Sequence, residues 1–129
     1  MSFATMICCM DGRIQLPAIK YLQNRFEVDF IDNITTAGPV GILSQQQDSV
    51  QTNEIEKLVT VSVDAHQSSR LAIVAHHDCA GNPIPDSDQV KQIYLCLQHF
   101  SSKFPQLEVI GLWIDGAQDI QEFRPVNKV

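Results

Sequence analysis

The chain has 129 residues, the length of one compact domain, and we expect a single domain over residues 1–129. Its formal net charge of −6 argues against a nucleic-acid-binding surface, which needs a basic patch. Its nine lysines and arginines are scattered, and no apolar run approaches the roughly 20 residues that span a bilayer. We therefore expect neither nucleic acid nor a membrane as a partner.

The first residues have the pattern of a strand rather than of a signal peptide, because the apolar run 3–9 has neither a basic segment before it nor a cleavage site after it. This pattern predicts a cytoplasmic protein, whose thiols stay reduced. In a reducing compartment, cysteines and histidines at motif-like spacings indicate metal binding or catalysis more than disulfide bonds. The cysteines are Cys8, Cys9, Cys79 and Cys96.

The first third of the chain predicts a strand, a helix and a second strand. Residues 3–9 form a short apolar run followed by Asp-Gly, which indicates a buried strand. Pro17 suits the first turn of a helix. The apolar residues of that helix recur at helical spacing, namely Ile19, Leu22 and Phe26. We expect the second strand over residues 28–34, with a glycine-containing loop after it.

The middle of the chain is contested between helix and strand. A short helix is expected to begin in residues 42–47. Asn53 and Glu56 form a capping box, which predicts that another helix follows. An alternation typical of a strand runs through Val59, Val61 and Val63. The capping box and the more than ten residues before Ser68 favour the helix.

The remaining elements are clearer up to the last segment. Residues 71–75 are the most strand-like run of the chain. Ser87 is expected to cap a helix that ends near Phe104. Residues 107–113 predict a fourth strand, and residues 114–129 are expected to add an edge strand or to pack on a partner.

Strands that alternate with helices predict an α/β fold of three layers, with a mainly parallel four-stranded sheet flanked by helices. Sites in such sheets lie beyond the carboxyl ends of the strands, where the strand order reverses. Cys9 and His76 each end or follow an expected strand at that edge. They converge if the first and third strands are neighbours.

The residues at this edge have the composition of a catalytic zinc site. Cys9, His76 and Cys79 offer two thiolates and an imidazole, which is a three-ligand set for Zn²⁺ with an open fourth position. Asp11 would accept a hydrogen bond from the occupant of that position, and Arg13 would keep Asp11 ionised. The pattern predicts attack by metal-activated water on a small electrophile.

The residues alone leave other interpretations open. A purely structural zinc site would need a fourth protein ligand, for which Asp11, His77 and Cys8 are candidates. The pair of Asp11 and Arg13 could be an ion pair that only braces the loop. A metal-free protein could instead use Cys9 as a nucleophile beside Arg13.

Two segments resemble motifs of the β-class carbonic anhydrases. Residues 9–13, CMDGR, resemble the Cys-x-Asp-x-Arg motif, and residues 76–79, HHDC, resemble the His-x-x-Cys motif. Residues 36–39, TAGP, are similar to the Asn-Ala-Gly segment that lies between these motifs in the family. The order of the three segments also agrees, so the resemblance covers roughly residues 6–113.

The resemblance implies a lyase that reversibly hydrates carbon dioxide to bicarbonate through zinc-bound hydroxide. It implies zinc held by Cys9, His76 and Cys79, with Asp11 and Arg13 as the catalytic pair. In some members the aspartate binds the zinc itself, so Asp11 is also a candidate fourth ligand. The resemblance further implies a sheet ordered 2-1-3-4 and a homodimer or larger homo-oligomer.

The chain departs from the family pattern beside both motifs. Thr35 and Thr36 stand where the family commonly has Arg-Asn, and Ala80 stands where a glycine usually follows the ligand cysteine. Two alternatives to carbon dioxide hydration follow. One is a related zinc hydrolase of carbonyl sulfide or carbon disulfide, and the other is a non-catalytic zinc-binding protein on the same fold.

Overall fold

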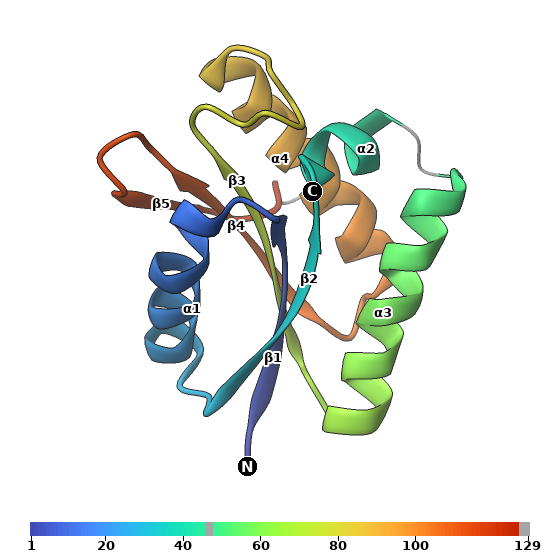
Figure 1. Ribbon diagram of the computed structural model, residues 1–129. Helices are drawn as coiled ribbons and strands as arrows, with labels where there is room; N and C mark the ends of the chain where they lie inside the picture. Colours follow the sequence, from blue (N-terminus) through green and yellow to red (C-terminus); the bar gives the residue numbers. More distant parts are fainter. Residues whose placement is uncertain (46–47, 127–129) are drawn as a thin grey trace.

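In the computed structural model, which describes residues 1–45 and 48–126, helices cover both faces of one five-stranded sheet (Figure 1). None of the helices in these residues is long and apolar enough to cross a membrane. The elements in chain order are β1 (Phe3–Cys9), α1 (Gly12–Phe26), β2 (Phe30–Thr36), α2 (Pro39–Gln45), α3 (Val50–His66), β3 (Arg70–His76), α4 (Asp86–Lys103), β4 (Glu108–Ile114) and β5 (Ile120–Phe123).

The strand order is β2-β1-β3-β4-β5, and the first four strands are parallel. The α/β fold and the order 2-1-3-4 of these four strands are therefore confirmed. The fifth strand, β5, pairs antiparallel with β4. It forms from part of the segment 114–129, for which an edge strand was one of two expectations; residues 127–129 lie outside the described part of the chain.

The two faces of the sheet bury different helices, because successive side chains of a strand point to opposite faces. Ile7 of β1 belongs to the core cluster that also contains buried residues of α2, α3 and α4. Met6 and Cys8 belong to the cluster with the apolar face of α1. Figure 1 shows α1 alone on its side of the sheet and the other three helices opposite.

The paired region of β1 and β3 is short. It joins Thr5–Ile7 to Leu71–Ile73, whereas β1 pairs with β2 along its full length up to Cys9. Beyond Ile7 and Ile73 the two central strands are no longer paired. This is the place where the order of the chain reverses in the sheet, and where a site is expected in this class of fold.

We expected Pro17 in the first turn of a helix. Helix α1 begins at Gly12, however, so Pro17 lies in its second turn. Proline has no N–H to donate to the carbonyl four residues earlier, which is that of Arg13. The Arg13 carbonyl instead accepts a hydrogen bond from Gln118 Nε2, at 3.2 Å. The β4–β5 turn therefore supplies the donor that Pro17 lacks.

Two other helix starts were also expected at the wrong residue. Ser49 caps α3 by accepting a hydrogen bond from the backbone N–H of Thr52 at 3.1 Å, so the expected capping box at Asn53 is wrong. The choice of helix over strand for this segment is confirmed. The first residue of α4 is Asp86, directly after Pro85, so Ser87 does not cap it.

The remaining differences are shifts of element ends. The second strand covers 30–36 rather than 28–34, because its backbone follows β1 up to Cys9. Helix α2 begins at Pro39, before the expected start. Residues 46 and 47 of that expected helix lie outside the described residues.

Candidate metal centre

The three predicted ligands lie together where β1 and β3 end. Cys9 is the last residue of β1, His76 is the last residue of β3, and Cys79 is in the loop that follows. The ligand atoms of these three buried residues all lie within 4.8 Å of one another. The two sulfur atoms are 3.8 Å apart and both cysteines are free thiols. The sheet topology thus brings together the donors from two distant segments.

The imidazole of His76 is oriented by one nitrogen and free at the other. Its Nδ1 lies 2.7 Å from the carbonyl oxygen of His77, and since a carbonyl only accepts, Nδ1 carries the proton. The other nitrogen, Nε2, is buried and has no hydrogen-bond partner among the described residues. An oriented imidazole with an unshared nitrogen beside two sulfurs is the donor set that Zn²⁺ prefers.

The surroundings of the Cys79 thiol act on its pKa in opposite directions. Burial and the neighbouring Cys9 raise the pKa of Cys79, while the backbone N–H groups of Gly81 and Asn82 lower it. In the absence of a cation, the balance favours the protonated thiol. A bound divalent cation would displace the thiol proton, and the N–H groups of Gly81 and Asn82 would then stabilise the thiolate.

The loop with Cys79 packs tightly on the loop that follows β2. A Cβ atom added at Gly81 would lie 2.6 Å from the carbonyl carbon of Ala37. A Cβ atom added at Gly38, whose φ is +56°, would lie 2.6 Å from the carbonyl carbon of Gly81. Both positions therefore require glycine, and the contact holds the ligand loop against the end of β2.

Two of the three candidate fourth ligands lie away from this cluster. Cys8 points to the opposite face of the sheet, where its sulfur lies 3.2 Å from Asn33 Oδ1. Burial raises the pKa of the Cys8 thiol to about 12. The half-exposed His77 pairs with Asp86, its Nδ1 lying 3.0 Å from Oδ2. Among the described residues, the metal-ligand cluster contains only the three predicted members.

Asp11 and Arg13 form a compact pair at the start of α1. Asp11 is the N-cap, and its Oδ1 accepts a hydrogen bond from the backbone N–H of Arg13 at 2.9 Å. The guanidinium binds the same carboxylate, with 2.7 Å between Nη2 and Oδ2 and 3.1 Å between Nε and Oδ1. These side-chain and backbone bonds lower the pKa of Asp11 to about 2, so it is ionised at neutral pH.

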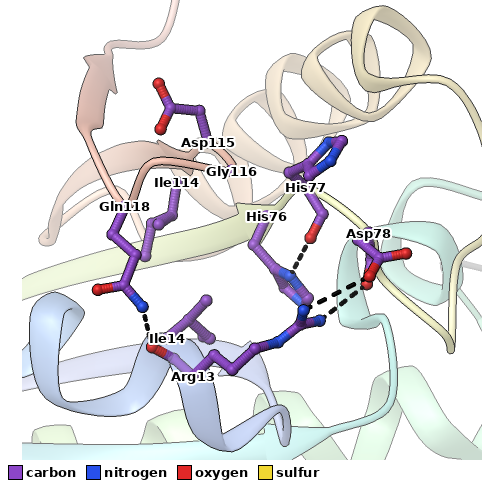
Figure 2. A pocket seen from close by; sticks show the side chains of 9 residues that line it. All are labelled: Arg13, Ile14, His76, His77, Asp78, Ile114, Asp115, Gly116 and Gln118. Carbon is purple, nitrogen blue, oxygen red and sulfur yellow. Dashed lines mark hydrogen bonds and ion pairs between the residues drawn. The ribbon is translucent and has the colours of Figure 1, made fainter.

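The guanidinium of Arg13 also contacts the ligand loop. Its Nη2 donates to the carbonyl oxygen of Asp78 at 3.2 Å, and its Nη1 lies 3.4 Å from Asp78 Oδ2. Figure 2 shows the contact between Arg13 and Asp78 among the residues that line a cavity of about 300 Å³. The cavity is lined by Arg13, Ile14, His76, His77, Asp78, Ile114, Asp115, Gly116 and Gln118. The start of α1 is thus joined to the segment that follows His76.

Several residues around the site were missed by the sequence interpretation. Gln15 Nε2 donates to the carbonyl of Cys9 at 2.7 Å, and Gln89 Nε2 donates to the carbonyl of His76 at 3.0 Å. Gln92 accepts a hydrogen bond from the side chain of Asn82 at 2.7 Å. The sequence could have indicated that Gln89 and Gln92 are buried, because they occupy helical positions on the apolar face of α4. No pattern in the sequence indicated the contacts of Gln15 and Asn82.

Comparison with known proteins gives a consistent result. A family model described as "Putative carbonic anhydrase" matches residues 1–124. No curated protein sequence matches the chain. A β-carbonic anhydrase, isoform I, from Trichomonas vaginalis is 14% identical, with a TM-score of 0.62 over 95% of this chain and 83% of that one.

Two further solved structures are similar. A β-carbonic anhydrase from Sordaria macrospora, one of two described as tetrameric, is 10% identical, with a TM-score of 0.58 over 95% of this chain and 81% of that one. The β-carbonic anhydrase CcaA is 11% identical, with a TM-score of 0.57 over 97% of this chain and 78% of that one. At such identities these likenesses concern the fold.

Proposed function

The chain belongs to the carbonic anhydrase family whose model matches residues 1–124, and on that basis we propose that it is a zinc-dependent lyase. The proposed reaction is the reversible hydration of carbon dioxide to bicarbonate. The observation that carries the proposal is the buried cluster of Cys9, His76 and Cys79. Its three donors leave a fourth position open, as catalytic zinc sites do.

The residues that would hold the zinc are Cys9 and Cys79 through sulfur and His76 through Nε2. When bound, Zn²⁺ lowers the pKa of a coordinated water molecule and so supplies a nucleophile near neutral pH. The hydrogen bond from His76 Nδ1 to the His77 carbonyl fixes the ring and its tautomer. The burial of all three ligands keeps competing solvent away from the sulfurs.

Asp11 would orient the reacting oxygen. With its pKa lowered to about 2 by Arg13, Asp11 is a carboxylate and can only accept hydrogen bonds. A carboxylate has about four acceptor sites. Three N–H groups of Arg13 bind this carboxylate, with the Nε–H shared between both oxygens, so one acceptor site is left. Asp11 would therefore accept a hydrogen bond from the attacking oxygen and direct a lone pair of that oxygen toward carbon dioxide.

The fourth position is proposed to be open rather than filled by Asp11. Both carboxylate oxygens of Asp11 bind Arg13, and Asp11 is not part of the ligand cluster. To bind a metal, Asp11 would have to give up hydrogen bonds that also cap α1. This arrangement favours the catalytic interpretation over a non-catalytic zinc site.

We also propose that the chain forms a homodimer or larger homo-oligomer and acts in the cytoplasm. Strand β2 is an edge strand, and a cavity of about 260 Å³ lies between it and α3. Leu58 and Val61 line this cavity and are 48% and 54% exposed. Apolar side chains beside an open strand edge are typical of a surface that a second protein copy covers.

The function is tested by stopped-flow hydration of carbon dioxide, comparing zinc-loaded protein with the same protein after chelation. We expect hydration that disappears with the metal and returns on reloading. Bound zinc without carbon dioxide hydration, together with turnover of carbonyl sulfide or carbon disulfide, would assign the chain to the related hydrolases. Bound zinc without either activity would support a non-catalytic zinc-binding protein.

A further inference from the structure

Helix α4 presents two buried amides to the segment 76–82, which contains two of the three ligands. Gln89 is 1% exposed and Gln92 is 8% exposed. They are three residues apart, so they lie on the same face of the helix. This face otherwise buries apolar side chains, such as Ile93. A buried polar group destabilises a protein unless it is hydrogen-bonded, so the partners of these amides indicate what the amides do.

Gln89 holds the backbone of His76. Its Nε2 donates to the His76 carbonyl oxygen at 3.0 Å, while the His76 ring is held by the carbonyl of the next residue. The other end of the amide, Oε1, is buried and has no partner among the described residues. A half-satisfied buried amide contributes little to net stability. The hydrogen bond to His76 is the interaction that distinguishes Gln89 from an apolar residue of the same size.

Gln92 holds the turn that contains Cys79. Its Oε1 accepts a hydrogen bond from Asn82 Nδ2 at 2.7 Å. The backbone N–H of Asn82 in turn donates to the carbonyl of Cys79 at 3.2 Å. The Asn82 side chain also packs against Gly41 of α2, where an added Cβ atom would lie 2.8 Å from Asn82 Oδ1. The amide of Gln92 thus fixes the turn between residues 79 and 82.

We propose that Gln89 and Gln92 are positioning residues that set the affinity of the Cys9–His76–Cys79 site for zinc. Through the His76 carbonyl and the Asn82 side chain, they hold two of the three ligands in place before the metal arrives. A site arranged in advance loses less conformational freedom when it binds. The inference rests on the proposed function only for the identity of the metal and does not depend on the reaction.

The test is a competition titration of the metal-free protein with Zn²⁺ against a chromophoric chelator. Gln89→Met keeps the length of the side chain but removes the donor, and Gln92→Met removes the acceptor. We expect zinc affinity to fall by about 10- to 100-fold in Gln89→Met, the range known for groups that orient metal ligands. We expect a smaller loss in Gln92→Met, which acts through Asn82.

The matched control is Ile93→Val, a substitution on the same face of α4 at a fully buried residue beside Gly111 of β4. We expect it to lower the thermal midpoint of the metal-free protein without changing zinc affinity. The visible absorption of the Co²⁺-loaded protein gives a second readout. Its ligand-field bands should shift in both glutamine variants and stay unchanged in Ile93→Val.

Unchanged zinc affinity and unchanged Co²⁺ bands in Gln89→Met would overturn the inference and leave the proposed function intact. An equal loss of affinity in Ile93→Val would also overturn it, because the effect would then follow from stability alone. Failure of the unsubstituted chain to bind zinc would refute the proposed function and this inference together. If Gln89→Met does not fold, Gln89→Asn keeps the amide with a shorter reach and is expected to show the same loss.

Discussion

The two sides of the candidate site are built in different ways. The ligands Cys9, His76 and Cys79 are 4%, 2% and 4% exposed and come from two distant segments. The side chains of Asp11 and Arg13 are 18% and 59% exposed and lie two residues apart at one helix start. The ligand side depends on the whole sheet, whereas the Asp–Arg side is assembled locally by a helix cap.

This difference indicates a division of work. Buried residues held by strands, tight loops and amides are suited to keeping a metal at one place. At the start of α1, the charge of Asp11 can be removed without loss of the N-cap, because asparagine caps a helix about as well as aspartate. Substitutions on the ligand side should therefore affect zinc and folding, and substitutions on the Asp–Arg side should affect the rate.

The largest effect is expected from Cys9→Ser. The substitution removes one thiolate from a three-ligand set, so zinc content should fall from one per chain to near zero, and carbon dioxide hydration should fall to the uncatalysed rate. Metal analysis and stopped-flow kinetics measure both. Cys8→Ser is the control, because Cys8 lies on the opposite face and its change should leave zinc content intact. Full zinc content in Cys9→Ser would show that Cys9 is no ligand.

The next effect is expected from Asp11→Asn. Asparagine retains the cap of α1 but not the charge, so zinc should stay bound while the hydration rate falls by about 10²-fold, as for loss of a positioned acid–base group. Asp78→Asn is the control, since Asp78 also pairs with Arg13 but is 74% exposed. The hydration rate of Asp78→Asn should differ from that of the unsubstituted chain by less than about threefold. Equal rates in Asp11→Asn and the unsubstituted chain would reduce the Asp–Arg pair to a structural brace.

A smaller effect, on stability, is expected from Gly81→Ala. The new Cβ would lie 2.6 Å from the carbonyl carbon of Ala37, so the two loops must separate. We expect a loss of about 1–3 kcal/mol in the free energy of unfolding, as for other overpacked sites. Gly12→Ala makes the same change where no atom lies within 4 Å. If both variants unfold at the same denaturant concentration, the interlocked loops do not support the ligand side.

The smallest effect is expected at Glu122 of β5, which fixes the helix that carries the Asp–Arg pair. Glu122 Oε1 accepts hydrogen bonds from Tyr21 and Arg25 of α1, each at 2.9 Å. Burial opposes ionisation of Glu122, but the bonds from Arg25 and Tyr21 outweigh it and lower its pKa below 4.5. Glu122→Gln should therefore reduce stability at pH 7 by about 1 kcal/mol.

The pH dependence of this effect has a definite sign. A carboxyl whose pKa is lowered by folding stabilises the protein above its unfolded pKa and loses that contribution as the pH falls through the folded pKa. The stability difference between the unsubstituted chain and Glu122→Gln should thus shrink as the pH falls below 4.5. Urea unfolding at a series of pH values measures it. A difference that persists unchanged in acid would exclude the charge of Glu122 as its cause.

The parts of the fold that could be predicted are those with strong local patterns. The apolar runs of β1 and β3, each ending at a motif residue, were enough to place Cys9 and His76 at one edge of a parallel sheet. Their convergence required β1 and β3 to be neighbours, which the sheet order confirms. The α/β class is also confirmed. The helical state of α3 is confirmed too, although the capping box that favoured it is wrong. The role of these residues as zinc ligands stays a prediction.

The parts that could not be predicted depend on distant contacts or on equivalent local signals. The partner of the Arg13 carbonyl, which Pro17 leaves without its helical donor, is Gln118, and this residue is far away in the chain. Ser49 and Asn53 are both good N-caps, and nothing local distinguishes them. The positions of Gln89 and Gln92 on the apolar face of α4 can be seen in the sequence, but their hydrogen-bond partners depend on how the segment 76–82 packs against α4.

A crystal structure of the zinc-loaded protein, with anomalous scattering recorded at the zinc edge over a range of pH, tests the central claim most directly. We predict one zinc ion bound to the sulfurs of Cys9 and Cys79 and to His76 Nε2, with water as the fourth ligand and Asp11 still paired with Arg13. Zinc at another place, or a fourth bond from Asp11 or another side chain at every pH, would contradict the proposal of a catalytic site.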